Sequence, residues 1–484
     1  MKHLAASLFF AAALAVNAQT NTLRVMSLPD CFVEALQHNF DVQVERYTPQ
    51  LSLYDLSSAY AGYDPQFSLS GEHSHSKSGG VFTTNVIPFS RNNSFNSDLG
   101  GALPWGMTYD LSGNVFDTTT SDSSGGSAGV SLAQPLLKNF WVDGTRQTIS
   151  LAKNSVKISE QSLRQQVINT VTAVENAFYE LIYARENTNV LQQALDLAEK
   201  QLADDKQRVQ IKVMAELGGT IEQDEAQVAS SRAGLISAQF SLASAQNALK
   251  NLITDNYLKW HDVDIIPSAP MEAARELFDV QDSWNKGMTQ RPDLIQARLD
   301  VENQGIRLKY SFNQLFPQLD LTGSYGFNGA GQEFSDSLGQ VQAGNRPFYS
   351  YGAKFSIPLS NARARNGYKS AQVTSQQVLL QLKQREQNVL VQIDDSVKQA
   401  RSAWESLEAT RSARVSAEAA LKAEQGKYNA GKSTTFTVLQ LQNRLTSARS
   451  QEIRSLANYN EALTSLAQQE GNTLVRRQID FKLK

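Results

Sequence analysis

Few side chains in this sequence have the types and spacing that chemistry requires. Of its five histidines, only His73 and His75 lie close enough to hold one metal ion from a single strand face. The sequence contains no HExxH, GxSxG or P-loop pattern. Its one cysteine, Cys31, allows no intramolecular disulfide and is expected to be a partly buried structural thiol. We therefore predict no catalytic residue, no cofactor and no metal site.

The first residues and the net charge of the chain indicate in which compartment the protein is found and which partners it could bind. Lys2 precedes an apolar run at 4–16, and the small residues at 16–18 suit cleavage, which is typical of a secretory signal peptide. The mature protein is expected to begin near Gln19. No later stretch has the roughly 18 continuous apolar residues of a membrane-spanning helix. The net charge of −3 gives no indication of a nucleic-acid partner.

Proline is confined to two zones. All twelve prolines lie before Leu136 or between Pro267 and Pro358, so the blocks 136–266 and 359–484 contain none. An interior proline costs a helix about 3 kcal/mol or more, and both blocks are rich in good helix formers such as Ala, Leu, Gln and Glu. Each block is therefore predicted to be mainly helical.

Glycine divides each block into two arms. The first block breaks at Gly218 and Gly219, and the second at Gly426 and Gly431. This pattern predicts two helical hairpins with long arms; an arm such as 147–212 would extend about 100 Å at 1.5 Å per residue. Apolar residues recur at three- and four-residue spacings along the second block, as in a coiled coil. These residues are Val389, Ile393, Val397, Ala400, Trp404 and Leu407.

The proline-containing zones alternate apolar and polar residues. Alternation is clearest at 66–71, 318–327 and 349–357, with polar, glycine-rich stretches at 118–127 and 328–345 that are predicted to be loops. Such segments have the length and period of transmembrane β-strands. One face of a soluble β-sandwich would alternate equally well. Attachment to such long helices in an exported chain favours membrane strands.

The sequence contains an internal repeat. A shift of 252 residues places Pro65 on Pro317 and Asp41 on Asp293 without a gap. The predicted segments are a signal peptide at 1–18, a first repeat at 19–266 and a second repeat at 267–484, each repeat with a helix, barrel strands and a long helical hairpin.

The same shift changes the interpretation of the two histidines. It places His73 and His75 opposite Tyr325 and Phe327. Amphipathic side chains near a membrane interface are thus favoured over a metal site.

The most specific segment is 428–440, YNAGKSTTFTVLQ, followed by Leu445 and Ala448; segments 291–294 and 315–317 add to it. In these residues the chain resembles the TolC-like outer-membrane efflux proteins, and the resemblance covers essentially all of the mature sequence. It implies an α+β membrane protein in which a trimeric transmembrane β-barrel continues into a long helical periplasmic barrel, with two internal structural repeats per chain. The expected localisation is the cell outer membrane with a periplasmic extension.

The physics of a membrane-spanning strand also favours a barrel to which several copies of the chain contribute strands. A strand in lipid cannot leave its edge unpaired, and four to six strands cannot close a conducting barrel. Pooling in a ring of identical copies solves both problems. The resemblance implies a passive channel of a tripartite efflux pump or type I secretion system. Its partners would be a periplasmic adaptor, an inner-membrane pump and outer-membrane lipid.

The resemblance also implies a gate at the hairpin turns. In TolC relatives, hydrogen bonds and rings of acidic side chains narrow the tunnel there. The family's tyrosine falls on Tyr428, and its acidic positions fall on Thr437, on Gln440 and near Thr220. None of these three residues is acidic, so the sequence departs from the family at the ring.

Acidic residues cluster instead beside the first turn. They are Glu216, Glu222, Asp224 and Glu225. A charged run on a helix is usually a solvated face. We hypothesise that some of these residues replace the missing ring and favour cations.

The first repeat contains an extra alternating pair, at 95–103 and 109–116, that the second repeat lacks. Two added strands preserve the up–down parity. We expect either a wider barrel with six strands per chain or a hairpin lying outside a four-strand contribution.

Three other classes of protein remain open. A periplasmic adaptor would have one hairpin and a small soluble β-domain. A structural coiled-coil envelope protein would be an extended stalk. An exported enzyme would need a catalytic constellation. The channel is favoured because the chain carries two complete repeats with barrel-like strands.

Overall fold

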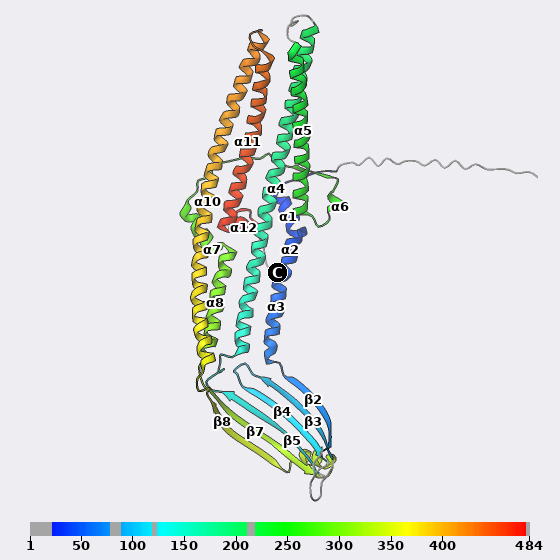
Figure 1. Cartoon of the computed structure of the whole chain (residues 1–484), viewed down its shortest axis with the longest axis vertical. Coiled ribbons are helices and arrows are strands. Elements are labelled where there is room, and N and C mark those ends of the chain that lie inside the picture. The colour runs from blue at the N-terminus through cyan, green and yellow to red at the C-terminus, as the bar shows by residue number, and fades with distance from the viewer. Residues whose placement is uncertain (1–21, 78–88, 119–122, 211–217, 481–484) are drawn as a thin grey trace, which may run out of the picture.

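The computed structural model describes residues 22–77, 89–118, 123–210 and 218–480; the predicted signal peptide lies outside these ranges. The molecule is elongated, with a curved sheet at one end and two helical hairpin tips at the other (Figure 1). Within the described ranges, we find no helix that is long and apolar enough to span a membrane.

Four long helices form the two predicted hairpins. They are α4 (Gly144–Gln210), α5 (Gly218–Ile253), α10 (Ala362–Asn429) and α11 (Thr435–Glu470). α4 packs along α5, α10 packs along α11, and α11 also packs along α4. The helices therefore stand side by side in the order α5, α4, α11, α10 (Figure 1).

The turn of the second hairpin is shorter than the glycines predicted. Gly426 lies inside α10, and only Gly431 adopts the left-handed conformation that makes the turn, with φ of 69°. Thr434 then caps α11, its side chain accepting a hydrogen bond from the Thr437 N–H. The predicted break at Gly426 was wrong because one glycine destabilises a helix by only about 1 kcal/mol, and α10 is packed along its length.

Shorter elements surround the long helices. Nearer the sheet, α3 (Tyr47–Tyr60) packs on α4, and α8 (Pro292–Asn313) packs between α4 and α10. The remaining small elements are β1 (Thr22–Met26), α1 (Leu28–His38), α2 (Phe40–Glu45), η1 (Ala61–Tyr63), α6 (Tyr257–Trp260), β6 (Val263–Pro267), α7 (Val280–Gln290) and α12 (Thr473–Arg476). β1 and β6 form a parallel pair.

The main core lies about midway along α4, where α1, α5 and β6 pack on it. Cys31 is completely buried there, and burial raises the pKa of its thiol to about 12. The expected structural thiol is thus found. The predicted seam on α10 is also buried, at Val389, Ile393, Val397, Ala400 and Leu407, with Trp404 packed beside it.

The internal repeat is visible in the backbone. Helices α1 and α7 occupy equivalent positions at the 252-residue shift. Each is followed by one residue with extended backbone, which occupies the N-cap position of the next helix. That residue is Asn39, with φ −66° and ψ 126°, in the first half, and Arg291, with φ −65° and ψ 122°, in the second. The two halves therefore enter their second helices in the same way.

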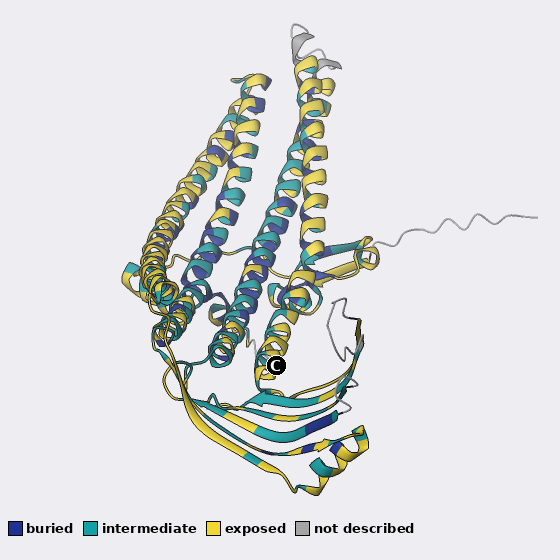
Figure 2. Ribbon diagram, turned by 60° about the horizontal axis from the view of Figure 1, so that its bottom comes forward, coloured by how far each residue is buried: buried dark blue, intermediate teal, exposed yellow. Residues whose placement is uncertain are grey.

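The sheet contains six antiparallel strands in the order β2-β3-β4-β5-β7-β8. Their bounds are β2 (Gln66–Lys77), β3 (Phe89–Ala102), β4 (Thr108–Thr118), β5 (Ser123–Pro135), β7 (Gln318–Gly331) and β8 (Pro347–Ser356). The sheet is strongly curved, and its last strand, β8, is almost entirely exposed (Figure 2). β2 at the other edge is exposed along its whole length.

The register gives the sheet one apolar and one polar face, because directly paired residues share a face. The apolar face carries Phe67, Leu69, Phe95, Leu99, Leu111, Val115, Val130, Leu132, Leu319, Leu321, Tyr325, Tyr349, Tyr351 and Phe355. The polar face carries Ser68, Glu72, Asn96, Asp98, Asp110, Asn114, Ser131, Asp320, Thr322, Ser324 and Lys354, with Phe116 and Phe348 as aromatic exceptions. The predicted alternation is confirmed.

The extra alternating pair belongs to the sheet. β3 and β4 lie between β2 and β5, so the first half contributes four strands and the second half two. A tight turn joins them, in which the Leu103 N–H donates to the Met107 carbonyl and Gly106 has φ of 92°. Of the two arrangements expected, six strands per chain is therefore the one found.

Two predicted loops contain regular structure. β5 already begins at Ser123, and stretch 328–345 holds the end of β7 and helix α9 (Phe334–Ala343). α9 lies on the apolar face, because Phe334 packs edge-to-face on Phe95 with ring centroids 5.6 Å apart. A Cβ at Gly329 would lie 2.1 Å from the Ser337 carbonyl oxygen. At 328–345 the loop prediction was wrong because glycine there allows close approach of a helix rather than a turn, whereas residues 119–122 of the first stretch lie outside the described ranges.

His73 lies on β2, and its ring nitrogen is 2.7 Å from the Asn93 side-chain oxygen on β3. Among the described residues, no group of three or more His, Cys, Asp or Glu side chains is arranged to hold a metal.

Candidate functional site

The candidate site lies near the hairpin tips, at the end of the molecule opposite the sheet (Figure 1). Each of the four long helices brings one polar residue to it. These residues are Asp205 on α4, Asp224 on α5, Tyr428 on α10 and Thr435 on α11; all four are buried, and each aspartate is only 1% exposed.

Asp205 is the centre of the site. Its Oδ1 accepts a hydrogen bond from the Tyr428 hydroxyl at 2.6 Å, and its Oδ2 accepts one from the Thr435 hydroxyl at 2.9 Å. The Gln201 side-chain amide donates to Oδ2 at 3.0 Å. Hydrogen bonds to an ionised acceptor are about twice as strong as those between neutral groups. One carboxylate from the first hairpin thus ties both helices of the second.

The local sequence places the two hydroxyls together. Tyr428 lies in the last turn of α10, and Thr435 is the first residue of α11 beyond the Gly431 turn. Their hydroxyl oxygens are 3.1 Å apart. The Tyr428 ring packs in an apolar cluster that closes the hairpin end, with Ala417, Leu421, Val438, Leu445 and Ala448. The turn therefore presents two hydroxyls on a fixed support.

Asp224 is the unusual member of the site. Neither of its carboxyl oxygens accepts a hydrogen bond from any donor in the described part of the chain. Burial raises the pKa of Asp224 to about 7, and the nearby negative charge of Asp205 acts in the same direction. A proton on Asp224 would let its hydroxyl donate to Asp205.

Exposed polar pairs surround this buried centre. Lys206 pairs with Glu225 across α4 and α5 at 2.8 Å. Gln227 and Asn443 exchange two side-chain hydrogen bonds across α5 and α11, at 2.8 and 2.9 Å. Exposed pairs of this kind contribute about 0–1 kcal/mol. The buried carboxylate is therefore the stronger link between the hairpins.

The predicted gate residues fall into distinct settings. Tyr428 and Asp224 are in the buried centre, whereas Glu222 and Glu225 are exposed on α5. Thr437 lies in the first turn of α11, its hydroxyl 3.0 Å from that of Thr434. Gln440 is exposed further along α11, the Thr220 side chain is not described, and Glu216 lies outside the described residues.

Sequence reasoning missed Asp205, Thr435 and Gln201. Asp205 stands in a charged run, Asp204-Asp205-Lys206, that is typical of a solvated face. Its role follows only from the packing of α11 on α4, which the residue pattern of either helix does not contain.

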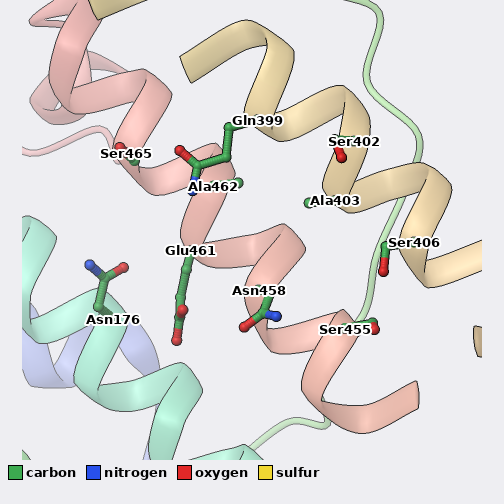
Figure 3. A pocket seen from close by; sticks show the side chains of 10 residues that line it. All are labelled: Asn176, Gln399, Ser402, Ala403, Ser406, Ser455, Asn458, Glu461, Ala462 and Ser465. Carbon is green, nitrogen blue, oxygen red and sulfur yellow. The ribbon is translucent and has the colours of Figure 1, made fainter. Parts of the chain in front are cut away.

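A second polar region lies beside Asn176, near the middle of α4, and Figure 3 shows the side chains that line it. A cavity of about 600 Å³ is lined by α10, α11 and Asn176 of α4. Gln399, Asn458 and Glu461 are among its polar side chains, and burial raises the pKa of Glu461. The lining is mostly polar and includes four serines, Ser402, Ser406, Ser455 and Ser465.

Comparisons with known proteins agree with this architecture. The structure resembles the crystal structure of the Campylobacter jejuni CmeC outer membrane channel with a TM-score of 0.69 and 16% sequence identity, over 92% of this chain and 86% of that one. This chain therefore has the fold of an outer-membrane channel protomer, the fold class that the sequence predicted.

Sequence comparisons then identify the family. The profile named outer membrane efflux protein matches residues 32–254 and 286–472, and the chain belongs to that family. It is 27% identical to the outer membrane efflux protein BepC of Brucella suis over 332 residues, 66% of either protein and so just under two thirds of BepC. It is 22% identical to the outer membrane protein TolC of Vibrio cholerae over 368 residues, 74% of this chain and 81% of TolC. The predicted family and outer-membrane localisation are confirmed.

Proposed function

We propose that three copies of this chain form a passive tunnel through the outer membrane that is closed at its periplasmic end by the Asp205 site. The tunnel would serve an inner-membrane transporter through a periplasmic adaptor, in a tripartite efflux pump or a type I secretion system. No reaction is catalysed in this scheme, and the energy comes from the transporter. Residues 19–266 and 267–484 would act as the two repeats of each protomer, after removal of residues 1–18.

The observation that carries the proposal is the sheet. It has one apolar face, one polar face and two unpaired edges, β2 and β8. Unpaired edges are untenable in lipid. Because β2 and β8 run in opposite directions, β8 of one copy can pair antiparallel with β2 of the next. The apolar face would then meet lipid and the polar face would line the tunnel.

The outer helices of the protomer support the same assembly. α3 and α5 flank one side of the helical layer and α10 the other. Large apolar side chains are exposed on both sides, including Tyr54 (69%), Phe240 (76%) and Leu380 (66%). A monomer would leave these surfaces in water, whereas a ring of copies would cover them.

At the gate, Tyr428 is proposed as a closing contact and Asp224 as part of the buried centre. Glu222 and Glu225 are the exposed carboxylates beside the opening, and they are proposed to favour cations there. Thr220, Thr437 and Gln440 occupy the positions where relatives carry acidic residues, and they are proposed to line the narrow end without contributing charge.

Electron microscopy of the detergent-purified protein and single-channel recording in a planar bilayer test this function together. We expect trimers with a continuous tunnel and discrete conductance steps. A monomer without conductance would contradict the channel. A protein that remains in the soluble periplasmic fraction without detergent would instead favour an adaptor or a structural envelope protein.

A further inference from the structure

Two buried carboxyl groups meet at the point where the two hairpins are joined. Asp205 and Asp224 are each 1% exposed, and they come from the two arms of the first hairpin. The Asp205 oxygens already accept hydrogen bonds from the second hairpin, through Tyr428 and Thr435. The Asp224 oxygens have no donor among the described residues. The two buried negative charges are therefore stable side by side only if a proton or a metal ion lies between the carboxyl groups.

A single proton meets that need. Two adjacent buried carboxylates repel each other, and one of them takes up a proton, as in the paired aspartates of aspartic proteases. Protonated Asp224 can donate its hydroxyl proton to Asp205 and leave the two hydroxyl donors of the second hairpin in place. A metal ion fits less well, because the described residues offer no group of three or more ligands at this point.

The geometry points to a proton-operated latch in which the Asp224 carboxyl group, by holding or losing one proton, controls whether Asp205 keeps the two hairpins together. With the proton bound, all four helices converge on Asp205. When the proton leaves to solvent, two negative charges face each other in a buried site, and the lowest-energy response is separation of the helices so that water enters. This inference rests on the proposed function, in which these tips are the closed end of the tunnel.

Charged side chains from several elements also surround the aspartate pair. The charged residues on the facing elements are Asp204 and Lys206 on α4, Glu222 and Glu225 on α5, Glu424 and Lys427 on α10, and Lys432 in the turn. The first nine residues of α11, Thr435 to Asn443, contain none. Ser433 and Lys427 lower the pKa of Glu424, whereas burial raises the pKa of Asp224.

The direction of the effect follows from linkage. The Asp224 pKa is raised from 3.8 to about 7 in the closed site, so the closed form binds a proton that the open, hydrated form releases. Closure is favoured at low pH, and this advantage is lost as the pH rises from about 4 through about 7, by up to about tenfold per pH unit. Between pH 5 and pH 8 the closed-to-open ratio is expected to fall by up to about a hundredfold.

The test compares wild-type protein with Asp224→Asn and with Asp204→Asn, the same substitution at an exposed position on α4. Asparagine has the shape of the protonated acid and can donate to Asp205, but it cannot titrate. Open probability is recorded in planar bilayers at pH 5, 6, 7 and 8. A second readout is the distance between spin labels at Gln207→Cys on α4 and Gln440→Cys on α11, measured by electron paramagnetic resonance in a Cys31→Ser background.

We expect wild type and Asp204→Asn to open, with increasing label distance, as the pH rises. Asp224→Asn should stay closed at every pH. The latch is contradicted if Asp224→Asn keeps the wild-type pH dependence of opening. It is also contradicted if wild-type channels conduct but their opening does not depend on pH. In either case the proposed channel function is unaffected. If the labels separate with pH in wild type but no variant ever conducts, the latch stands and the proposed channel fails.

Discussion

The two halves of this chain start alike and end differently. Helices α1 and α7 lie at equivalent positions, and Asn39 and Arg291 follow them with nearly the same backbone angles. Beyond that point the first half contributes four strands and the second half two. At the tips, the first half supplies two buried aspartates and the second half two hydroxyl groups.

The difference shows where a duplicated chain can diverge without losing its fold. β3 and β4 were added as one antiparallel hairpin, which returns the chain to the end of the sheet where it started. Every following element therefore keeps its original end of the sheet. At the tips, acceptors on one hairpin and donors on the other allow a bond between halves that two identical hairpins could not form. The repeat thus accounts for the shared architecture of the two halves, and the departures from it account for the unequal strand numbers and for the hydrogen bonds between the hairpin tips.

The largest expected effect concerns a contact between the halves midway along the helices. Glu175 of α4 is 1% exposed and pairs with Arg477, which follows α12 near the end of the second half. Arg477→Ala would leave a buried carboxylate without its cation, and we expect a loss of about 3–5 kcal/mol of stability, measured by denaturant unfolding.

The adjacent arginine gives a matched control. Arg476 pairs with Glu276 at 2.7 Å in a more exposed setting. Arg476→Ala is expected to cost less than about 1 kcal/mol. Equal losses in the two variants would show that the halves are not held together by the buried pair.

The next effect lies at the tips. Tyr428→Phe removes one hydrogen bond to the Asp205 carboxylate and keeps the packed ring. A hydrogen bond to a charged group contributes about 1.5–3 kcal/mol, so the closed-to-open ratio in bilayer recordings should fall at least about tenfold. Tyr47→Phe, an exposed position on α3, should leave it unchanged. An unaltered closed-to-open ratio in Tyr428→Phe would show that the Tyr428 hydroxyl does not help to close the tunnel.

A third comparison concerns the strand that carries α9. Gly329→Ala would place a Cβ against the Ser337 carbonyl, whereas Gly339→Ala, on α9 itself, meets nothing within 4 Å. We expect Gly329→Ala to destabilise this region by about 1–3 kcal/mol, seen as a lower temperature of trimer dissociation in detergent. Gly339→Ala should be neutral or slightly stabilising. Identical dissociation temperatures would mean that α9 does not pack on β7.

The smallest expected effect is at the rim of the tip. Lys206→Met removes the exposed ion pair with Glu225. Because both side chains are about half exposed, the change in stability should be below about 1 kcal/mol and should vanish at high salt. A larger, salt-independent loss would mean that the exposed pair, and not Asp205, joins the helices of the first tip.

Much of the frame could be predicted from the sequence, because its signals are local. Absence of proline marked both hairpins, alternation marked the strands at 66–71 and 318–327, and the register of the repeat matched α1 to α7. Local signals failed where a glycine had a non-local role. Gly426 is tolerated inside a packed helix, and Gly329 makes room for α9.

The candidate site was only partly predictable. Tyr428 was found through its turn motif, and Asp224 through its acidic neighbours. Asp205 lies 223 residues from Tyr428 in the chain, and no pattern within either helix indicates which residues meet across the hairpins. The choice between four and six strands per chain was open for the same reason, because strand order is a property of pairing and not of alternation.

A density map of the detergent-purified protein, at a resolution that separates strands, would show whether the unequal halves build one tunnel with six strands from each of three copies. We expect a trimer with eighteen barrel strands, in which β8 of each copy pairs with β2 of the next. Helices α4, α5, α10 and α11 should converge at the far end. A barrel of twelve strands with β3 and β4 outside it, or a protein that stays monomeric, would contradict this expectation.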